Sequence, residues 1–263
     1  MISGDFLDNK AKTSKIDRYT ILREYLQLLF LRYFYEEKTK GLKVYFKGGT
    51  AIRFLFNSFR FSEDLDFTGV GEGKIINRIL KNLLPKVERE SGFKIAIKDE
   101  KVFEKRSLGY RLVFVGEGLR QPLGIRLDFS FRERPLDPET SYLSVMDYPV
   151  SPLPLIEHLS RKEITAEKIR AIFSRSQPRD LFDLWFLFKG GARVEWGMVK
   201  SKMKYYPEIV YSKNVLIEKI AKYKTEEMKR DLNQFIPEGY RRYEKFIPEV
   251  IEHLNSQTLN PKS

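Results

Sequence analysis

The chain has 263 residues, 42% of them hydrophobic and 14% aromatic, which is enough to bury one large core or two small ones. It has no cysteine and only two histidines, which excludes disulfides and thiolate metal sites and leaves no zinc-ligand pattern. The formal net charge is +12. This excess of basic residues is typical of proteins that bind a polyanion, but a lysine-rich surface that only keeps the protein soluble explains it equally well.

No targeting or membrane segment is evident. The first twenty residues lack the apolar core of a secretory signal, and the longest apolar run, Tyr25–Tyr35, is too short to cross a bilayer and contains Arg32. We therefore expect a cytoplasmic protein that does not bind to membranes.

The first part of the chain alternates between helical and strand patterns. The expected elements are, in chain order, a helix over Ile16–Lys38, a strand over Val44–Phe46, a helix over Thr50–Phe56, a strand over Asp64–Phe67, a helix over Gly73–Glu90, and strands over Phe93–Ile97, Tyr110–Val115 and Gly124–Ser130.

A proline cluster at Pro149–Pro154 marks a boundary, and beyond it the pattern is almost entirely helical. The expected helices cover Ile164–Phe173, Pro178–Phe188, Trp196–Tyr205, Asn214–Tyr223 and Glu238–Asn255. We therefore predict an α+β protein, with a sheet domain over residues 1–150 and a helical domain over residues 151–263.

The segment Lys47–Phe67, KGGTAIRFLFNSFRFSEDLDF, contains the first candidate site. Gly48 and Gly49 lie between a strand and a helix, where free backbone N–H groups and the positive end of the helix dipole can bind phosphate. The hydroxyl of Thr50 adds a donor at the same place. An ordinary turn is the alternative, and for a glycine pair alone it is the more common one.

Three aspartates suggest a metal site beside this turn. Asp64 and Asp66 alternate with apolar residues on one strand, so both point to the same face, and Asp128 has the same pattern on a later strand. If the two strands are neighbours, three carboxylates converge, and carboxylate oxygens suit Mg²⁺ or Mn²⁺. The alternative is a solvated acidic turn capped by Ser62.

Two motifs together resemble a known family. The first is GGT followed by EDLDF, over Gly48–Phe67. The second is EITAEKIRA at Glu163–Ala171, followed by RDLFDL at Arg179–Leu184. They are similar to the signatures of the AbiEii/AbiGii toxin family within the DNA-polymerase-β-like nucleotidyltransferases. The spacing from Thr50 to Asp64 is slightly longer than usual for the family.

The resemblance implies a mixed β-sheet of nucleotidyltransferase type flanked by helices, with the helical domain completing the active-site cleft. It also implies an NTP substrate, bound through Gly48, Gly49 and Thr50, and a possible cognate antitoxin as partner. Asp64, Asp66 and Asp128 would hold the metal.

Within the second motif the resemblance implies that Lys168 binds the triphosphate and that Asp183 or Asp180 orients it. The alternatives are an ordinary lysine in an ion pair, and an aspartate that only begins a helix, since a carboxylate is favoured in the first helical turn.

The acceptor is predicted to be RNA, with the 3′ end of tRNA as the first candidate. Lysines and tyrosines interleave over Lys200–Lys224, and such a surface suits single-stranded or folded RNA. Half-buried tyrosines packed in helices are the alternative explanation. Two other functions stay open, namely an enzyme of the same fold that modifies a protein or small-molecule hydroxyl, and a non-catalytic RNA-binding module.

Overall fold

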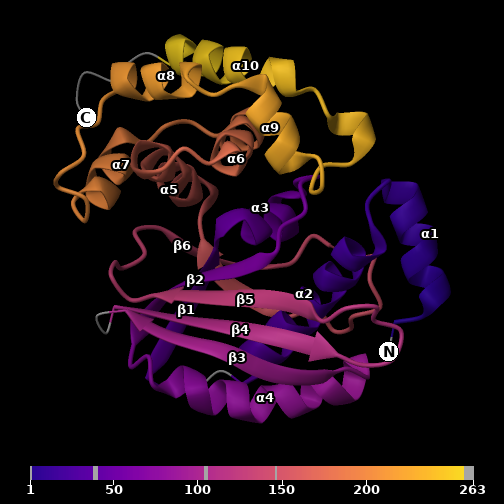
Figure 1. The fold of residues 1–263 in the computed structure, drawn as a ribbon. Coiled ribbons are helices and arrows are strands. Elements are labelled where there is room, and N and C mark those ends of the chain that lie inside the picture. Colours follow the sequence, from indigo (N-terminus) through magenta and orange to yellow (C-terminus); the bar gives the residue numbers. More distant parts are fainter. Residues whose placement is uncertain (1, 38–40, 104–105, 146, 258–263) are drawn as a thin grey trace. The chain divides into compact units, whose positions relative to one another are not determined.

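The computed structural model describes residues 2–37, 41–103, 106–145 and 147–257 (Figure 1). The chain divides into two compact units. The first comprises Met1–Arg134 and Pro138–His158, and the second comprises Pro135–Asp137 and Leu159–Ser263. The predicted boundary after residue 150 falls before strand β7 (Leu155–Leu159), which pairs with β1 (Leu42–Lys47) in the sheet of the first unit.

In the described part of the first unit, the strands form one seven-stranded mixed sheet with the order β3-β4-β5-β2-β1-β7-β6. The remaining strands are β2 (Asp64–Gly71), β3 (Lys94–Phe103), β4 (Ser107–Val115), β5 (Leu123–Ser130) and β6 (Pro138–Tyr142). β2 runs parallel to β5 and antiparallel to β1. The two aspartate-bearing strands are therefore neighbours, which is the condition for their carboxylates to share one face of the sheet.

Side-chain alternation gives the centre of this sheet one apolar and one polar face. Leu65, Phe67, Leu127 and Phe129 are fully buried. The rings of Phe67 and Phe129 stack at 4.8 Å, and both contact Phe34 of helix α2 (Arg18–Glu36). This packing leaves the aspartates of β2 and β5 on the opposite, polar face.

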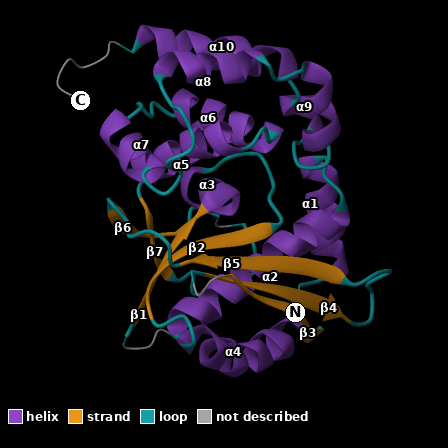
Figure 2. Ribbon diagram, turned by 60° about the vertical axis from the view of Figure 1, so that its left-hand side comes forward, coloured by secondary structure: helices purple, strands orange, loops and turns teal. Residues whose placement is uncertain are grey.

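The other helices of the first unit are α1 (Gly4–Ser14), α3 (Gly48–Phe56) and α4 (Ile75–Ser91). α4 packs against α2 and β3, and α2 also packs against β5, so these two helices cover the apolar face of the sheet (Figure 2). α3 follows β1 directly and contacts both β1 and β2. The junction between β1 and α3 therefore lies beside the first aspartate strand.

The second unit is built from helices (Figure 2). They are α5 (Arg161–Ser174), α6 (Pro178–Lys189), α7 (Trp196–Met203), α8 (Lys213–Ala221), α9 (Thr225–Leu232), the short 3₁₀ helix η1 (Glu238–Tyr240) and α10 (Tyr243–Ser256). α5 packs against α6, α7 and α8, and α10 packs against α6, α8 and α9. The predicted α+β class is confirmed.

The sequence pattern missed α1, α9, β6 and β7. α1 and α9 bury only one and two side chains respectively, so neither carries a full apolar stripe. β6 begins with Pro138 and has no buried residue, and β7 lies at the end of the proline-rich segment. The end predicted for the first long helix, Lys38, lies outside the described residues.

Within the described residues, no helix is both long and apolar enough to cross a membrane.

Candidate active site

The polar face of the sheet brings Asp66 and Asp128 together. They are register partners on the adjacent parallel strands β2 and β5. Neighbouring strands lie about 5 Å apart, so the two carboxylates are close enough to share a ligand. On its other side Asp66 has Lys47, the last residue of β1, as its register partner. The carboxylate pair therefore lies next to the junction that leads into α3.

Gly48 begins that junction and touches the carboxylate of Asp66. Its φ angle is +81°, in the region that favours glycine, and a Cβ atom at this position would overlap Asp66 Oδ2. Any other residue would therefore both strain the backbone and displace the carboxylate. The glycine is required by the close approach of the turn to Asp66, which a simple connecting turn does not need.

Gly49 lies against a different neighbour. A Cβ atom at Gly49 would overlap Nη2 of Arg60, which is a buried residue whose Nη1 donates a hydrogen bond to the backbone oxygen of Phe61. A guanidinium thus lies against the turn at the N-terminus of α3. Together with the N–H groups of the first helical turn, which have no acceptor within the helix, it makes this place favourable for an anion.

The hydroxyl of Thr50 has a structural partner. Its Oγ1 donates a hydrogen bond of 2.5 Å to the backbone oxygen of Asp64, and the residue is buried. The proton that was predicted to reach a phosphate therefore ties α3 to the start of β2. In this arrangement Thr50 positions the glycine turn relative to the aspartates.

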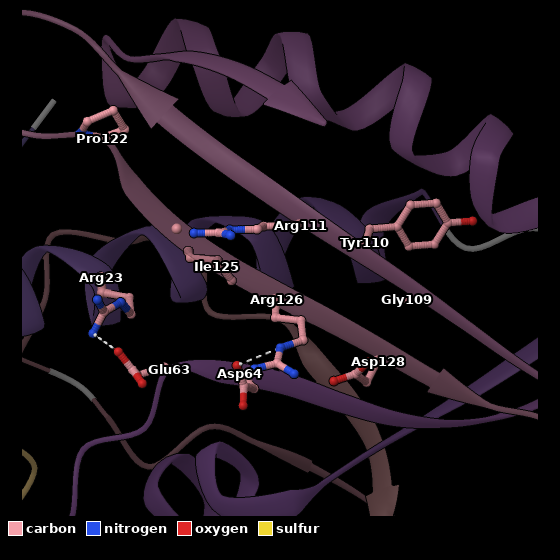
Figure 3. A pocket seen from close by; sticks show the side chains of 11 residues that line it. Arg23, Glu63, Asp64, Gly109, Tyr110, Arg111, Pro122, Ile125, Arg126 and Asp128 are labelled. Carbon is pink, nitrogen blue, oxygen red and sulfur yellow. Dashed lines mark ion pairs between the residues drawn. The ribbon is translucent and has the colours of Figure 1, made fainter. Parts of the chain in front are cut away.

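Asp64 faces a cation of its own sheet. Nε of Arg126 lies 3.5 Å from Asp64 Oδ1, and the two residues are register partners on β2 and β5 (Figure 3). Burial raises the pKa of Asp128, Arg126 opposes this rise, and the charge of Asp64 adds to it. Arg126 thus offsets part of the negative charge of Asp64 and Asp128.

A pocket of about 570 Å³ opens beside these carboxylates (Figure 3). Its lining comes from the first unit alone. The charged residues that line it are Arg23, Glu63, Asp64, Arg111, Arg126 and Asp128. Arg23 forms an ion pair with Glu63, with Nη1 3.1 Å from Oε1.

The donor set of this face fits a hard divalent cation. Carboxylate oxygens are the ligands that Mg²⁺ and Mn²⁺ prefer, and Asp66 and Asp128 are opposite each other on adjacent strands. Among the residues that the structure describes, no three Asp, Glu, His or Cys side chains are already grouped as metal ligands. Arg126 forms an ion pair with Asp64, so binding of a metal ion at Asp64 would require the Arg126 guanidinium to move away.

The second motif forms a buried network within the second unit. Nζ of Lys168 on α5 lies 3.0 Å from Asp180 Oδ1 and 2.7 Å from Asp183 Oδ2, and both aspartates are on α6. Arg175 Nε adds a contact of 2.8 Å to Asp180. Burial would raise the pKa of Asp180, but Lys168 and Arg175 outweigh it and hold this pKa well below its ordinary value. Both aspartates therefore hold the ammonium group of Lys168.

The same unit contains a second buried lysine between two acids. In this case the lysine follows its two acids in the sequence, whereas Lys168 precedes them. Lys202 on α7 lies between two glutamates of α5, with Nζ 2.6 Å from Glu163 Oε1 and 3.0 Å from Glu167 Oε1. The other oxygen of Glu163 accepts hydrogen bonds from the N–H groups of Leu136 and Asp137. This network attaches the segment Pro135–Asp137 to the helical unit.

The lysine–tyrosine surface predicted over Lys200–Lys224 is only partly a surface. Lys202 and Tyr223 are buried, and Lys219 donates to the backbone oxygen of Phe173. Tyr206 is packed under the guanidinium of Arg170. These residues serve helix packing, because a tyrosine buries most of its ring wherever a neighbouring helix covers it.

Sequence reasoning missed the cations of the first unit, namely Arg60, Arg111 and Arg126. Arg126 could have been recognised, since it lies two residues before Asp128 on a strand and must share its face. Arg60 and Arg111 could not, because their positions depend on contacts between segments distant in sequence.

A glycine turn that touches one of two aspartates on a strand, with a third aspartate on the neighbouring strand of a mixed sheet, is the arrangement that the family resemblance predicts for a nucleotidyltransferase. The family model described as "Nucleotidyl transferase AbiEii toxin, Type IV TA system" matches residues 30–259, and the chain belongs to this family. The family predicted from the two motifs is confirmed. As a member, the protein is a nucleotidyltransferase with an NTP substrate.

Solved structures agree with the fold. The chain is similar to MenT4, a nucleotidyltransferase toxin from Mycobacterium tuberculosis H37Rv, with a TM-score of 0.66 and 18% identity over 98% of this chain and 91% of that one. It is also similar to JHP933 from Helicobacter pylori, with a TM-score of 0.56 and 19% identity over 91% and 92% of the two chains. No curated protein matches the chain significantly in sequence.

Proposed function

We propose that the protein transfers a nucleoside monophosphate from an NTP to the 3′-terminal hydroxyl of an RNA, with tRNA as the first candidate, and that it acts as a toxin or phage-defence enzyme paired with an antitoxin. The observation that carries this proposal is the arrangement of Asp66, which is opposite Asp128 and in contact with Gly48. This arrangement places a phosphate-binding glycine turn directly beside carboxylates that can hold a metal ion.

Each residue of the first unit has a role in this proposal. Gly48 and Gly49 let the backbone approach the β- and γ-phosphates, and Thr50 keeps the turn in position. Asp64, Asp66 and Asp128 would hold Mg²⁺ or Mn²⁺, which would neutralise the phosphates and polarise the α-phosphorus. Asp128 also accepts the proton of the attacking hydroxyl.

The reaction is a simple displacement. The acceptor oxygen forms a bond to the α-phosphorus, the bond from that phosphorus to the oxygen of the β-phosphate breaks, and pyrophosphate leaves. Lys168, held by Asp180 and Asp183, neutralises the charge that develops on pyrophosphate.

The net charge of +12 supports a polyanionic acceptor, although the lysine–tyrosine segment supports it less than its sequence suggested. The family description, "Type IV TA system", supports an antitoxin as partner.

The test is incubation with each labelled NTP, Mg²⁺ and total RNA, followed by a denaturing gel. The Asp64→Ala/Asp66→Ala variant serves as the blank. Label in a discrete RNA band, absent from the blank, is the expected result. Label only in protein or small-molecule fractions would refute the RNA acceptor, and no label with any NTP would favour a non-catalytic RNA-binding module.

A further inference from the structure

The arginines of the 570 Å³ pocket are not explained by NTP binding at the glycine turn. The strand order places β4 and β5 on one side of the Asp66 strand, and β1 with its glycine turn on the other. The pocket is lined from β4, β5, α2, the first residue of β2 and the residues just before β2 and β5, with no contribution from β1 or α3. The strand that carries Asp66 thus lies between the glycine turn and the strands β4 and β5 that line the pocket.

Two of these arginines form a cross-strand pair of like charge. Arg111 on β4 and Arg126 on β5 are register partners. Like charges directly opposite each other on a sheet are destabilising unless something between them is negative. Arg111 has no ion pair among the side chains that the structure describes, and Asp99, its register partner on β3, has a side chain outside that set.

The acidic partner of Arg126 is held only weakly. The Nε atom of Arg126 lies 3.5 Å from Asp64 Oδ1, and 61% of the Arg126 side chain is exposed. Ion pairs this exposed contribute at most about 1 kcal/mol. Asp64 is also a proposed metal ligand, so an ion at Asp64 would leave the Arg126 guanidinium without its carboxylate and beside the pocket (Figure 3).

We propose that Arg111 and Arg126 bind a backbone phosphate of the acceptor RNA, and that the pocket between them and Asp128 receives its terminal nucleotide. This inference rests on the nucleotidyl transfer proposed above and names the place of the second substrate. Guanidinium groups bind phosphate through paired N–H donors, and the pocket volume lies within the range of roughly 300–1,000 Å³ that is usual for ligand sites.

Under this assignment the two substrates of the transfer bind on opposite sides of the Asp66 strand. The NTP phosphates occupy the glycine turn, and the acceptor hydroxyl approaches the carboxylates from the Asp128 side. The arginine pair fixes the strand that carries this hydroxyl, and phosphate contacts of this kind set position rather than sequence preference.

The experiment measures RNA binding and NTP binding separately, each in the absence of the other substrate, so that turnover cannot interfere. The RNA probe is a fluorescent ten-nucleotide single-stranded RNA with a free 3′ hydroxyl, followed by anisotropy at several salt concentrations. NTP binding is followed by calorimetry with each of the four NTPs and Mg²⁺. The variants are Arg111→Ser, Arg126→Ser and their combination. Arg78→Ser is the matched control, because Arg78 is an exposed arginine on α4, which covers the opposite face of the sheet.

Each arginine variant is expected to weaken RNA binding by about tenfold and to lower the slope of the salt dependence by about one phosphate contact, without weakening NTP binding. Arg78→Ser should bind RNA like the parent protein, and Arg111→Lys should keep part of the affinity. The melting temperatures show that the variants stay folded, which is expected because both side chains are exposed.

Three results would overturn the inference. They are an equal loss of RNA affinity in Arg78→Ser, a loss of NTP rather than RNA affinity in the arginine variants, and no RNA binding by the parent protein. If RNA binds through Arg111 and Arg126 but no NTP transfers label to RNA in the active protein, the RNA site stands and the proposed transfer reaction fails.

Discussion

The acidic residues of the sheet and those of the helical unit differ in how far the chain neutralises them. In the helical unit, Asp180 and Asp183 are almost fully buried and share the ammonium group of Lys168. On the sheet, 25% of the Asp64 side chain is exposed, and its partner Arg126 is more exposed still. A carboxylate that is partly exposed and weakly paired can accept a ligand, whereas a buried carboxylate that is fully paired positions the group it holds.

The same contrast separates the two networks within the helical unit. Lys202 and Lys168 are both buried between two acids, but Lys202 is 1% exposed at its side chain and Lys168 is 10% exposed. Glu163 additionally satisfies two backbone N–H groups. We therefore propose a structural role for Lys202 and retain for Lys168 the catalytic role that the family motif implies. Four substitutions test these two contrasts, the one between the sheet and the helical unit and the one between Lys202 and Lys168.

The largest effect is expected at Asp66. Asp66→Asn should lower the rate of nucleotide transfer by about 1,000-fold, close to 4 kcal/mol, because the amide removes a charge from the metal and phosphate site. The melting temperature should change little, and Mn²⁺ binding by calorimetry should be lost. Glu139→Gln, an exposed acid on β6, is the control. Equal Mn²⁺ binding by Asp66→Asn and wild type would contradict the metal assignment.

A loss of stability is expected at Lys202. Lys202→Met leaves Glu163 and Glu167 buried without their cation, and breaking such a pair from one side costs about 3 kcal/mol. Urea denaturation followed by fluorescence measures the change in the free energy of unfolding. Lys204→Met, two residues away and exposed, should behave like wild type. Transfer activity per folded molecule should stay near wild type, and a selective loss of activity would make Lys202 functional.

Lys168 should respond in the opposite way. Lys168→Ala is expected to weaken NTP binding or turnover by at least about tenfold, or 1.4 kcal/mol, when assayed well below its melting temperature. The control is Lys162→Ala, which lies outside the motif and removes a partly exposed ion pair with Asp137. If Lys168→Ala is destabilised but keeps full turnover per folded molecule, Lys168 is structural, like Lys202.

The smallest effect concerns the acid sensitivity of the helical unit. The pKa of Asp180 is lowered in the folded state, so its ion pairs stabilise the fold above the ordinary value of 3.8 and lose this effect as the pH falls below it. Wild type should therefore be more stable than Asp180→Asn near neutral pH, and the difference should shrink below about pH 4. Thermal denaturation between about pH 3 and pH 6 measures this difference. A difference that does not depend on pH would show that Asp180 acts through packing alone.

The sequence alone determined the local features of this protein. Alternation on β2 and β5 predicted which faces Asp64, Asp66 and Asp128 occupy, and the strand–Gly-Gly–helix pattern predicted the turn. Helical periodicity found the long helices because their apolar stripes are regular. These features depend on neighbours within a few residues, so the chain encodes them locally.

The tertiary structure decided which of these residues meet. Gly48 is needed because it touches Asp66, and the Arg60 guanidinium lies against Gly49. Lys202 lies in the segment that the sequence predicted to bind RNA, but in the fold it is a buried counterion of Glu163. Arg111 and Arg126 become partners only because β4 and β5 pair. Such pairings depend on strand order and helix packing, which bring together segments far apart in the sequence and so cannot be predicted from local patterns.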